Sequence, residues 1–221
     1  MLRGLFVTGT DTGVGKTVAT AAVLHRYRRV ASLRYWKPIQ TGVESDDDTA
    51  EVRRLSGCDE DEIFGRGIRL PAPVSPHLAA RLSGCSIDIR ELAGLVATEP
   101  PTTRWIVEGA GGVLVPLNDT QLMTDLMRLL NLPVVVVTRS TLGTINHTLL
   151  TLEALRARVL HVVGVLMIGA RSTENRIAIE RYGCVPVIGE MPWLETMQPD
   201  AVASWATAHL DPRHALAECF R

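Results

Sequence analysis

Gly9-Thr10-Asp11-Thr12-Gly13-Val14-Gly15-Lys16-Thr17 is the stretch that decides the fold of this 221-residue chain. It follows the apolar run Leu5–Val7 and precedes the helix-prone segment Val18–Arg28. A strand, a glycine-rich loop and a helix in this order are typical of a phosphate-binding loop. Glycines let the backbone turn tightly and direct successive N–H groups at an anion. The helix that begins near Lys16 adds the positive end of its dipole.

The end of the loop carries the residues for phosphate chemistry. Lys16 supplies a mobile charge for the terminal phosphates, and Thr17 supplies a hydroxyl that can ligate Mg²⁺. Five residues separate Gly9 from Gly15, so the loop is one residue longer than the common pattern. A glycine-rich turn that only caps a helix is the alternative interpretation. We expect the nucleotide phosphates to lie along Thr12, Gly13, Val14, Gly15, Lys16 and Thr17.

Composition limits the class of protein. Hydrophobic residues make up 46% of the chain, and 23 basic against 24 acidic residues give a net charge of -1. This balance offers no electrostatic argument for nucleic acid or an anionic membrane. The four cysteines contain no Cys-x-x-Cys pair, so neither a zinc site nor a disulfide framework is expected. With no signal-peptide layout and no apolar run of roughly 20 residues, we expect a cytoplasmic protein with one domain, residues 1–221.

Strand-like and helix-like segments alternate along the chain. This alternation predicts an α/β, P-loop NTPase-like fold with a mostly parallel sheet and helices on both faces. Asp48 is a candidate N-cap, with Glu51 in the position of a capping box. Residues 39–48 and 63–75 are predicted to be irregular. We expect strands at about 2–8, 33–36, 104–107, 133–137, 162–168 and 185–188, and helices at about 16–30, 49–55, 76–83, 88–97, 121–130, 142–157, 173–182 and 200–219, the last broken near Pro212.

Four segments of small and charged residues follow predicted strands. They are Gly9–Thr17, Lys37–Thr41, Glu108–Gly112 and Ser140–Asn146. Ligands of such sheets bind beyond the carboxyl ends of the strands. We therefore expect the four segments to converge on one face of the molecule.

The charged residues in these segments each allow two interpretations. Glu108 can bind Mg²⁺ or its waters, as the acid at the end of a Walker B strand does, or it can be a solvated acid beside a turn. Lys37 can hold an anion or be an ordinary exposed lysine, and Thr41 lies close enough in sequence to share its ligand. Asp48 is either a second acidic ligand near the metal or only a helix cap.

Five blocks of sequence carry a family resemblance. They are Gly9–Thr17, Lys37–Gly42, Glu108–Gly112, Leu142–His147 and Gly189–Leu194, and they extend over most of the chain. In their order and composition they resemble dethiobiotin synthetase, of which the longer phosphate-binding loop is also characteristic. The resemblance implies a homodimeric, Mg²⁺- and ATP-dependent ligase of biotin synthesis. That enzyme closes the ureido ring of dethiobiotin from 7,8-diaminopelargonic acid and CO₂.

The resemblance also implies roles for individual residues. One substrate amine becomes a carbamate, ATP phosphorylates it, and the second amine displaces phosphate. Lys37 and Lys16 would be catalytic, and Mg²⁺ would be held by Thr17, Asp48 and Glu108. Lys37 and Thr41 would hold the substrate, whose far carboxylate would meet the other subunit's helix start at Leu142, Gly143, Thr144 and Asn146. Beyond the loop, the nucleotide would contact Asp48, Glu108, Gly109, Ala110, Gly111, Ile168, Gly169, Pro192, Trp193 and Leu194.

Two positions depart from the family pattern. Some members carry Glu where this chain has Gly13, so a role for that acid does not transfer. Some also read adenine with an Asn after the strand that ends here at Ile168-Gly169, where this chain has none. A site without directed hydrogen bonds discriminates poorly between analogues, so we expect weak base selectivity.

Two other functions use related loops. Partner-regulated ATPase switches carry a signature lysine five positions before the loop lysine, where this chain has Asp11. Their membrane-binding members end in a basic amphipathic helix, whereas this tail holds Asp211, Pro212 and Glu218. An ATP-dependent amidoligase for another acid would need a glutaminase partner or domain, and 221 residues leave no room for the domain.

Overall fold

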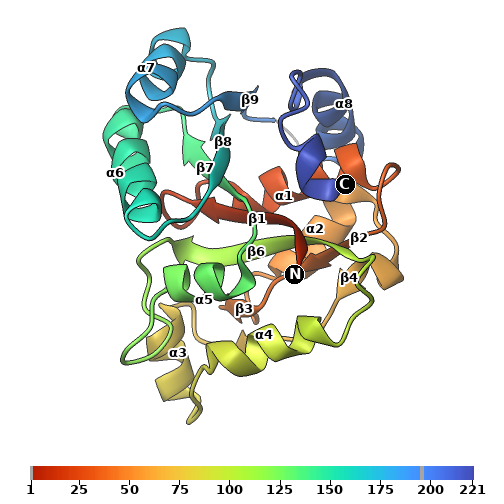
Figure 1. The fold of residues 1–221 in the computed structure, drawn as a ribbon, viewed down its shortest axis with the longest axis vertical. Coiled ribbons are helices and arrows are strands. Elements are labelled where there is room, and N and C mark those ends of the chain that lie inside the picture. The colour runs from red at the N-terminus through yellow and green to blue at the C-terminus, as the bar shows by residue number, and fades with distance from the viewer. Residues whose placement is uncertain (1, 195–196) are drawn as a thin grey trace.

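A seven-stranded parallel sheet forms the centre of the computed structural model, which describes residues 2–194 and 197–221 (Figure 1). The strand order is β4-β2-β6-β1-β7-β8-β9. The central position of β1 places the loop that follows it at the middle of the sheet's carboxyl edge. The strands are β1 (Arg3–Gly9), β2 (Leu33–Trp36), β4 (Ile63–Phe64), β6 (Arg104–Gly112), β7 (Val134–Arg139), β8 (Val162–Ile168) and β9 (Val187–Met191).

Helices cover both faces of the sheet and enclose two apolar cores. Successive strand side chains point to opposite faces: Phe6 enters one core, and Leu5 and Val7 enter the other. The second core lies under α1 (Lys16–Tyr27), α2 (Asp48–Ser56) and α8 (Pro199–His209). The core that contains Phe6 lies under α3 (Pro76–Leu82), α4 (Ile89–Ala97), α5 (Met123–Leu130), α6 (Thr144–Arg156) and α7 (Thr173–Gly183).

None of the described helices is long and apolar enough to cross a membrane.

Most predicted elements are confirmed, with small changes at their ends. The strands predicted at 33–36 and 162–168 have the observed bounds. The helix predicted at 16–30 ends at Tyr27, and the strand predicted to end at 107 continues as β6 to Gly112. The last strand lies at 187–191 rather than 185–188. The predicted break near Pro212 is confirmed, since α8 ends at His209 and a short 3-10 helix follows at Ala217–Phe220.

The two segments predicted to be irregular contain short strands, so that prediction was wrong. β3 (Ile39–Thr41) and β5 (Ile68–Leu70) form a separate two-stranded parallel sheet, and β4 joins the edge of the main sheet. A 3-10 helix at Glu60–Glu62 precedes β4. Strands of two or three residues are too short to show an alternating pattern, and only their non-local partners define them.

The N-cap of α2 is Asp47, so the prediction of Asp48 as the cap was wrong. Asp47 Oδ1 accepts hydrogen bonds from the backbone N–H groups of Thr49 and Ala50, at 3.1 and 3.2 Å. Asp47 has the extended backbone that an N-cap requires, whereas Asp48 is already the first helical residue. Glu51 pairs with Arg54 instead of closing a capping box. The carboxylate of Asp48 is therefore available to the space beside the sheet.

Candidate active site

A cavity of about 680 Å³ opens beyond the carboxyl ends of β1, β2 and β6. The strand register explains why. Trp36 pairs with Val107, so the next residues, Lys37 and Glu108, come side by side, and Val7 of β1 pairs with Glu108 from the other side. Three of the four segments predicted to converge line this cavity, together with Asp48 from α2. Their residues in its wall include Thr12, Gly13, Gly15, Lys16, Thr17, Lys37, Thr41, Glu108, Ala110 and Gly111.

The phosphate-binding loop curves around the base of α1. Gly13 and Gly15 have φ angles of 68° and 96°, a left-handed backbone that residues with a Cβ adopt only with strain. Lys16 Nζ donates to the carbonyl oxygen of Asp11 at 2.8 Å, so the side chain lies over its own loop. Burial, followed by the charge of Lys37, lowers the pKa of Lys16 from 10.5 to about 8. A phosphate beside Lys16 would therefore stabilise the charged form of this lysine.

Two carboxylates meet a lysine and a hydroxyl at the floor of the cavity. Thr17 Oγ1 lies 2.7 Å from Asp48 Oδ1 and 3.3 Å from Glu108 Oε1. Lys37 Nζ donates to Glu108 Oε1 at 2.7 Å and forms an ion pair with Asp48 Oδ2. The side chains of Glu108 and Lys37 are only 0% and 4% exposed. Glu108 is therefore not a solvated acid and Lys37 is not an ordinary exposed lysine, so these two alternative interpretations of the sequence are excluded.

The charges in this cluster stabilise one another. Burial alone would lower the pKa of Lys37, but the nearby Glu108 and Asp48 outweigh burial and raise it. Burial alone would raise the pKa of Asp48, but Lys37 and a hydrogen bond from Thr17 lower it. Both groups are therefore held in their charged forms.

Tyr35 is a member of the cluster that the sequence did not indicate. Its hydroxyl donates to Glu108 Oε2 at 3.2 Å, and its side chain is fully buried. Burial and the adjacent Glu108 raise the pKa of Tyr35. In the sequence, Tyr35 is simply one residue of an apolar strand, and nothing local distinguishes it from a core residue.

The oxygen atoms around Thr17 have the chemistry that Mg²⁺ requires. Mg²⁺ takes oxygen ligands and usually keeps several waters while binding one or two carboxylates and the substrate phosphates. Thr17 offers a hydroxyl that lies within hydrogen-bonding distance of two carboxylates, those of Asp48 and Glu108. Within residues 2–194 and 197–221, no group of three or more His, Cys, Asp or Glu is arranged to hold a metal by itself. The donor set fits a metal that arrives with phosphates and water.

The fourth predicted segment lies outside this cavity. Leu142 is fully exposed, and Gly143, with φ 92°, is the N-cap of α6. The hydroxyl of Thr144 is buried and hydrogen-bonded to Thr138 Oγ1 at 2.9 Å, while Asn146 is exposed. Within one chain, therefore, Leu142–Asn146 do not join the other three segments.

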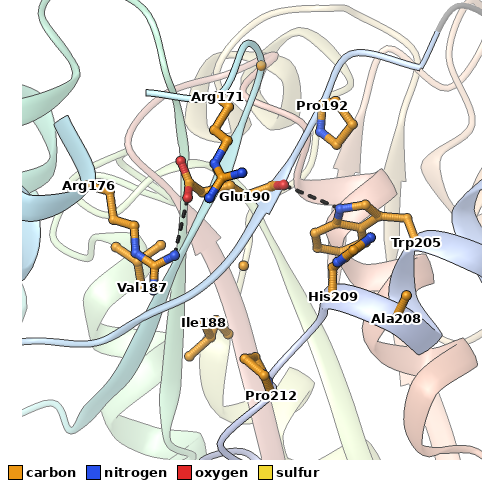
Figure 2. Close-up of a pocket in the computed structure, with 12 residues that line it drawn as sticks. Arg171, Arg176, Val187, Ile188, Glu190, Pro192, Trp205, Ala208, His209 and Pro212 are labelled. Carbon is orange, nitrogen blue, oxygen red and sulfur yellow. Dashed lines mark hydrogen bonds and ion pairs between the residues drawn. The ribbon is translucent and has the colours of Figure 1, made fainter. Parts of the chain in front are cut away.

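The residues expected near the base lie beside a second cavity of about 410 Å³. Gly169 and Pro192 line it, along with α7, β9 and α8. Figure 2 shows Glu190 facing Arg171 and Arg176 across from the aromatic wall of Trp205 and His209. Of the other expected residues, Ile168 packs beside Gly15 of the phosphate-binding loop, Trp193 is exposed, and Leu194 is half-buried.

The backbone at Gly169 explains why no Asn follows β8. Its φ angle is 133°, and a Cβ there would lie 2.4 Å from Ser140 Oγ. Any larger side chain would be strained and would clash with Ser140. Ser140 Oγ is itself buried and has no hydrogen-bond partner among the described residues, and Trp193 Nε1 lies 3.4 Å from the same Cβ position. Ser140 stood at the start of a predicted segment, but its contact with Gly169 is visible only in the fold.

Comparison with known proteins gives consistent matches over most of the chain. Residues 3–201 match a family model described as an AAA domain. The ATP-dependent dethiobiotin synthetase of Paramagnetospirillum magneticum is 46% identical over 91% of this chain and 94% of that protein. The corresponding protein of Agrobacterium fabrum is 42% identical over 93% of each chain. A bifunctional biotin biosynthesis protein of Bordetella avium is 46% identical over 92% of this chain, which spans 42% of that protein's length.

Solved structures match the fold at low sequence identity. A ParA family ATPase from Chlorobium tepidum has a TM-score of 0.57 and 10% identity, covering 93% of this chain and 98% of that one. The septum site-determining protein MinD of Pyrococcus horikoshii, solved with Mg-ADP, has a TM-score of 0.56 and 14% identity, covering 93% and 95%. These likenesses confirm the predicted P-loop NTPase fold class.

Proposed function

Because the chain belongs to the AAA domain family and, within it, to the ATP-dependent dethiobiotin synthetases, we propose that it closes the ureido ring of dethiobiotin in biotin biosynthesis. The substrates are 7,8-diaminopelargonic acid (7,8-diaminononanoate), CO₂ and ATP, and the other products are ADP and phosphate. The observation that carries the proposal is the cluster of Lys37, Glu108, Asp48 and Thr17 beside the phosphate-binding loop.

The phosphates of ATP lie in the loop between Thr12 and Thr17. Backbone N–H groups and the start of α1 face them, and Lys16 moves from the Asp11 carbonyl onto the terminal phosphates. Phosphoryl transfer depends mainly on positioning and charge neutralisation, so these groups need no covalent role. Lys37 lines the same cavity as the loop, so it can reach the terminal phosphate.

Thr17, Asp48 and Glu108 would hold Mg²⁺ at the phosphates. When bound, the ion supplies neutralisation of the negative charge that accumulates on the transferring group. Tyr35 keeps Glu108 in place from the side opposite Thr17. The protein thus contributes a small set of oriented oxygens and leaves the remaining positions to water and phosphate.

Lys37 and Thr41 hold the carbamate that one substrate amine forms with CO₂. A carbamate oxygen attacks the terminal phosphorus and ADP leaves, which gives a mixed anhydride. The second amine then attacks the anhydride carbon, and phosphate leaves as the ring closes. Lys37 stabilises the negative charge in both steps because it is buried, charged and adjacent to the loop.

The far carboxylate of the substrate needs an anion site, and the start of α6 offers one through its free backbone N–H groups. Because Leu142–Asn146 lie outside the cavity of their own chain, we assign this site to a second copy in a homodimer. Leu142 and Leu150 support the assignment, since they are large exposed apolar residues, the first just before α6 and the second on it. The base of the nucleotide lies near Ile168, Gly169 and Pro192-Trp193-Leu194, beside the second cavity that Gly169 and Pro192 line. We assign the chain one catalytic domain and a cytoplasmic location.

A direct assay tests this function. The protein is incubated with diaminopelargonic acid, bicarbonate, Mg²⁺ and ATP, and the products are identified by mass spectrometry. We expect dethiobiotin and ADP, in equal amounts, only when all four components are present. ATP hydrolysis that ignores the diamine would contradict the proposal and favour an ATPase switch.

A further inference from the structure

Four threonine hydroxyls form a chain of hydrogen bonds between the phosphate-binding loop and the start of α6. Thr138, near the end of β7, is at its centre. Its Oγ1 lies 2.9 Å from Thr144 Oγ1 and 3.0 Å from Thr148 Oγ1, both on α6. Thr10 of the loop makes a longer contact with the same atom, at 3.4 Å. Thr144 also donates to the carbonyl oxygen of Arg139.

The hydrogen of each hydroxyl in this chain can be assigned. A threonine hydroxyl has one hydrogen to donate and two lone pairs that accept. Because Thr144 gives its hydrogen to the Arg139 carbonyl, the hydrogen between Thr138 and Thr144 must come from Thr138. Thr138 then accepts from Thr148 and Thr10 with its two lone pairs. The hydrogen-bonding capacity of the Thr138 hydroxyl is therefore fully used, and buried networks satisfied in this way are rigid.

Burial by itself does not require a hydroxyl at position 138. Val134 and Val136 precede Thr138 on the same face of β7 and pack in the core that α6 covers. A third valine would fill the same volume and continue this apolar row. Three other buried threonine hydroxyls have no hydrogen-bond partner in the part of the chain that the structure describes, those of Thr8, Thr20 and Thr124. The hydroxyl chain is thus a specific feature of the contact between β7 and α6.

No side chain among the described residues caps the start of α6. Its N-cap is Gly143, which has no side chain and has a φ angle of 92°. The N–H groups of a helix's first turn have no partner within the helix, and the proposed function gives them to the far carboxylate of the substrate. The side chain of Thr144 is buried against the sheet. The hydrogen bond from Thr138 therefore holds the first residue of α6 in place.

We propose that Thr138 is a positioning residue for the far carboxylate, because its hydroxyl fixes the direction in which the N–H groups at the start of α6 point. The inference rests on the proposed function and adds to it a residue that does not touch the substrate. In the proposed homodimer, this carboxylate belongs to the substrate in the partner's cavity. Loss of the hydroxyl should weaken substrate binding and leave the chemical step unchanged, because Thr138 does not line the cavity that holds the reacting groups.

Thr138→Val removes the hydroxyl and keeps the shape of the side chain. We expect the KM for diaminopelargonic acid to rise about tenfold while kcat stays within about twofold, as when a contact made equally in the ground and transition states is lost. Thr138→Ser restores a hydroxyl and should restore most of the affinity. Thr151→Val is the matched control, because Thr151 is also buried on α6 but donates to the carbonyl oxygen of His147, at 2.8 Å. The control should keep both constants.

A ligand without the carboxylate separates positioning from a general loosening of the site. 2,3-Diaminononane has the same diamine and carbon chain but ends in a methyl group. Its inhibition constant against diaminopelargonic acid should be the same for Thr138→Val and the unaltered protein, although the KM for the acid differs. Equal weakening of both ligands, or no weakening of the acid, would overturn the inference.

Thr144→Val decides the matter if Thr138→Val does not fold, since it removes the same hydrogen bond from the side of the helix. It should raise the KM as Thr138→Val does, whereas Thr148→Val leaves that bond intact and should not. An equal KM for Thr144→Val and Thr148→Val contradicts the proposal. The product assay separates the two hypotheses. A protein that makes no dethiobiotin loses the proposed function, and one that makes it with the same KM in Thr138→Val loses only this inference.

Discussion

At the scale of single residues, the site depends on charges that the fold has removed from water. Counted over the whole residue, Lys16, Lys37 and Glu108 are 7%, 8% and 0% exposed. In such surroundings each charge interacts more strongly with its neighbours than it would in solvent. Small changes at one residue should therefore alter the affinity for metal and phosphate more than they alter the fold.

Lys16 should make nucleotide binding depend on pH. Burial lowers its pKa to about 8, so the free lysine is charged below pH 8 and loses its proton above. Bound phosphates favour the charged form of Lys16 and raise its pKa. Nucleotide binding should therefore take up about one proton at pH 9 and little at pH 7. Affinity for a non-hydrolysable ATP analogue should accordingly fall as the pH rises above 8.

Calorimetry in buffers of different ionisation enthalpy measures this proton uptake. Lys16→Ala should show none, and its turnover should fall by about 10²–10³ because one oriented charge is lost. The same proton uptake in Lys16→Ala would assign the titration to another group. Without nucleotide, Lys16 affects folding stability in the opposite direction to a lysine whose pKa is raised by a carboxylate. Between pH 8 and 10.5 the unfolded chain binds more protons at Lys16 than the folded protein does. The contribution of Lys16 to the free energy of unfolding therefore rises with pH.

Removal of a metal oxygen should raise the Mg²⁺ requirement. Glu108→Gln and Thr17→Val each take one oxygen ligand or acceptor from a hard cation. We expect the Mg²⁺ concentration for half-maximal activity to increase by about tenfold or more in both variants. Asp48→Asn should act in the same direction but more weakly. Titrations that overlay the curve of the unaltered protein for both main variants would contradict the metal site.

At the scale of elements, the start of α2 positions the acid that faces the cavity. Asp47 caps the helix, and the next residue, Asp48, then points toward Thr17 and Lys37. If the helix began one residue later, Asp48 would be the N-cap and its carboxylate would no longer face the cavity. The cap therefore fixes both the helix and one wall of the site.

Loss of this cap should cost stability. Asp47→Ala removes acceptors for the N–H groups of Thr49 and Ala50, so unfolding should become easier by about 0.5–2 kcal/mol. The exposed ion pair between Asp47 and Arg69 adds little to this value. Asp47→Asn keeps the capping oxygen and should stay close to the unaltered protein in urea unfolding. If Asp47→Ala and Asp47→Asn lower the free energy of unfolding equally, the lost interaction is the ion pair between Asp47 and Arg69 and not the helix cap.

The end of β8 should make the enzyme tolerant of different bases. Gly169 cannot carry a side chain that reads the base, because its φ angle is 133° and a Cβ there would lie 2.4 Å from Ser140 Oγ. We expect ATP, CTP and GTP to compete for binding with similar affinities. A preference for ATP above about 10³-fold, roughly 4 kcal/mol, would reveal a reading group elsewhere in the site. Gly169→Asn should be destabilised rather than more selective, which thermal unfolding would show.

At the scale of the whole molecule, the proposed homodimer can be tested by mixing two inactive variants. Lys37→Ala removes the carbamate ligand. Gly143→Trp blocks the start of α6, where a Cβ would make only an ordinary contact, with His147 Cε1 at 3.8 Å. Neither homodimer should work. In mixed dimers one of the two shared sites keeps both intact parts, so activity should return to about a quarter of the normal value on statistical mixing.

This mixing experiment needs evidence of folding and exchange. Gly143 has a φ angle of 92°, so Gly143→Trp carries some backbone strain, and its thermal unfolding must be compared with that of Gly143→Ala. Subunit exchange is followed by native mass spectrometry with one partner isotopically labelled. If exchange is complete and activity does not return, the carboxylate is bound within one chain.

The sequence by itself determined the phosphate-binding loop, the α/β class and the strand ends where the site lies. These features depend on neighbouring residues: glycine spacing, apolar runs and the helix that follows them. Gly9–Thr17, Lys37–Thr41 and Glu108–Gly112 therefore met at one cavity as expected. The site roles assigned to them remain predictions.

Only the tertiary structure decided which charges pair. Lys37 and Tyr35 reach Glu108 across 71 and 73 positions of sequence, and Thr17 reaches Asp48 across 31. The short strands β3 and β5, and the contact of Ser140 with Gly169, likewise exist only through distant partners. Local patterns carry no information about such partners, because the sheet's register brings them together only after it has formed.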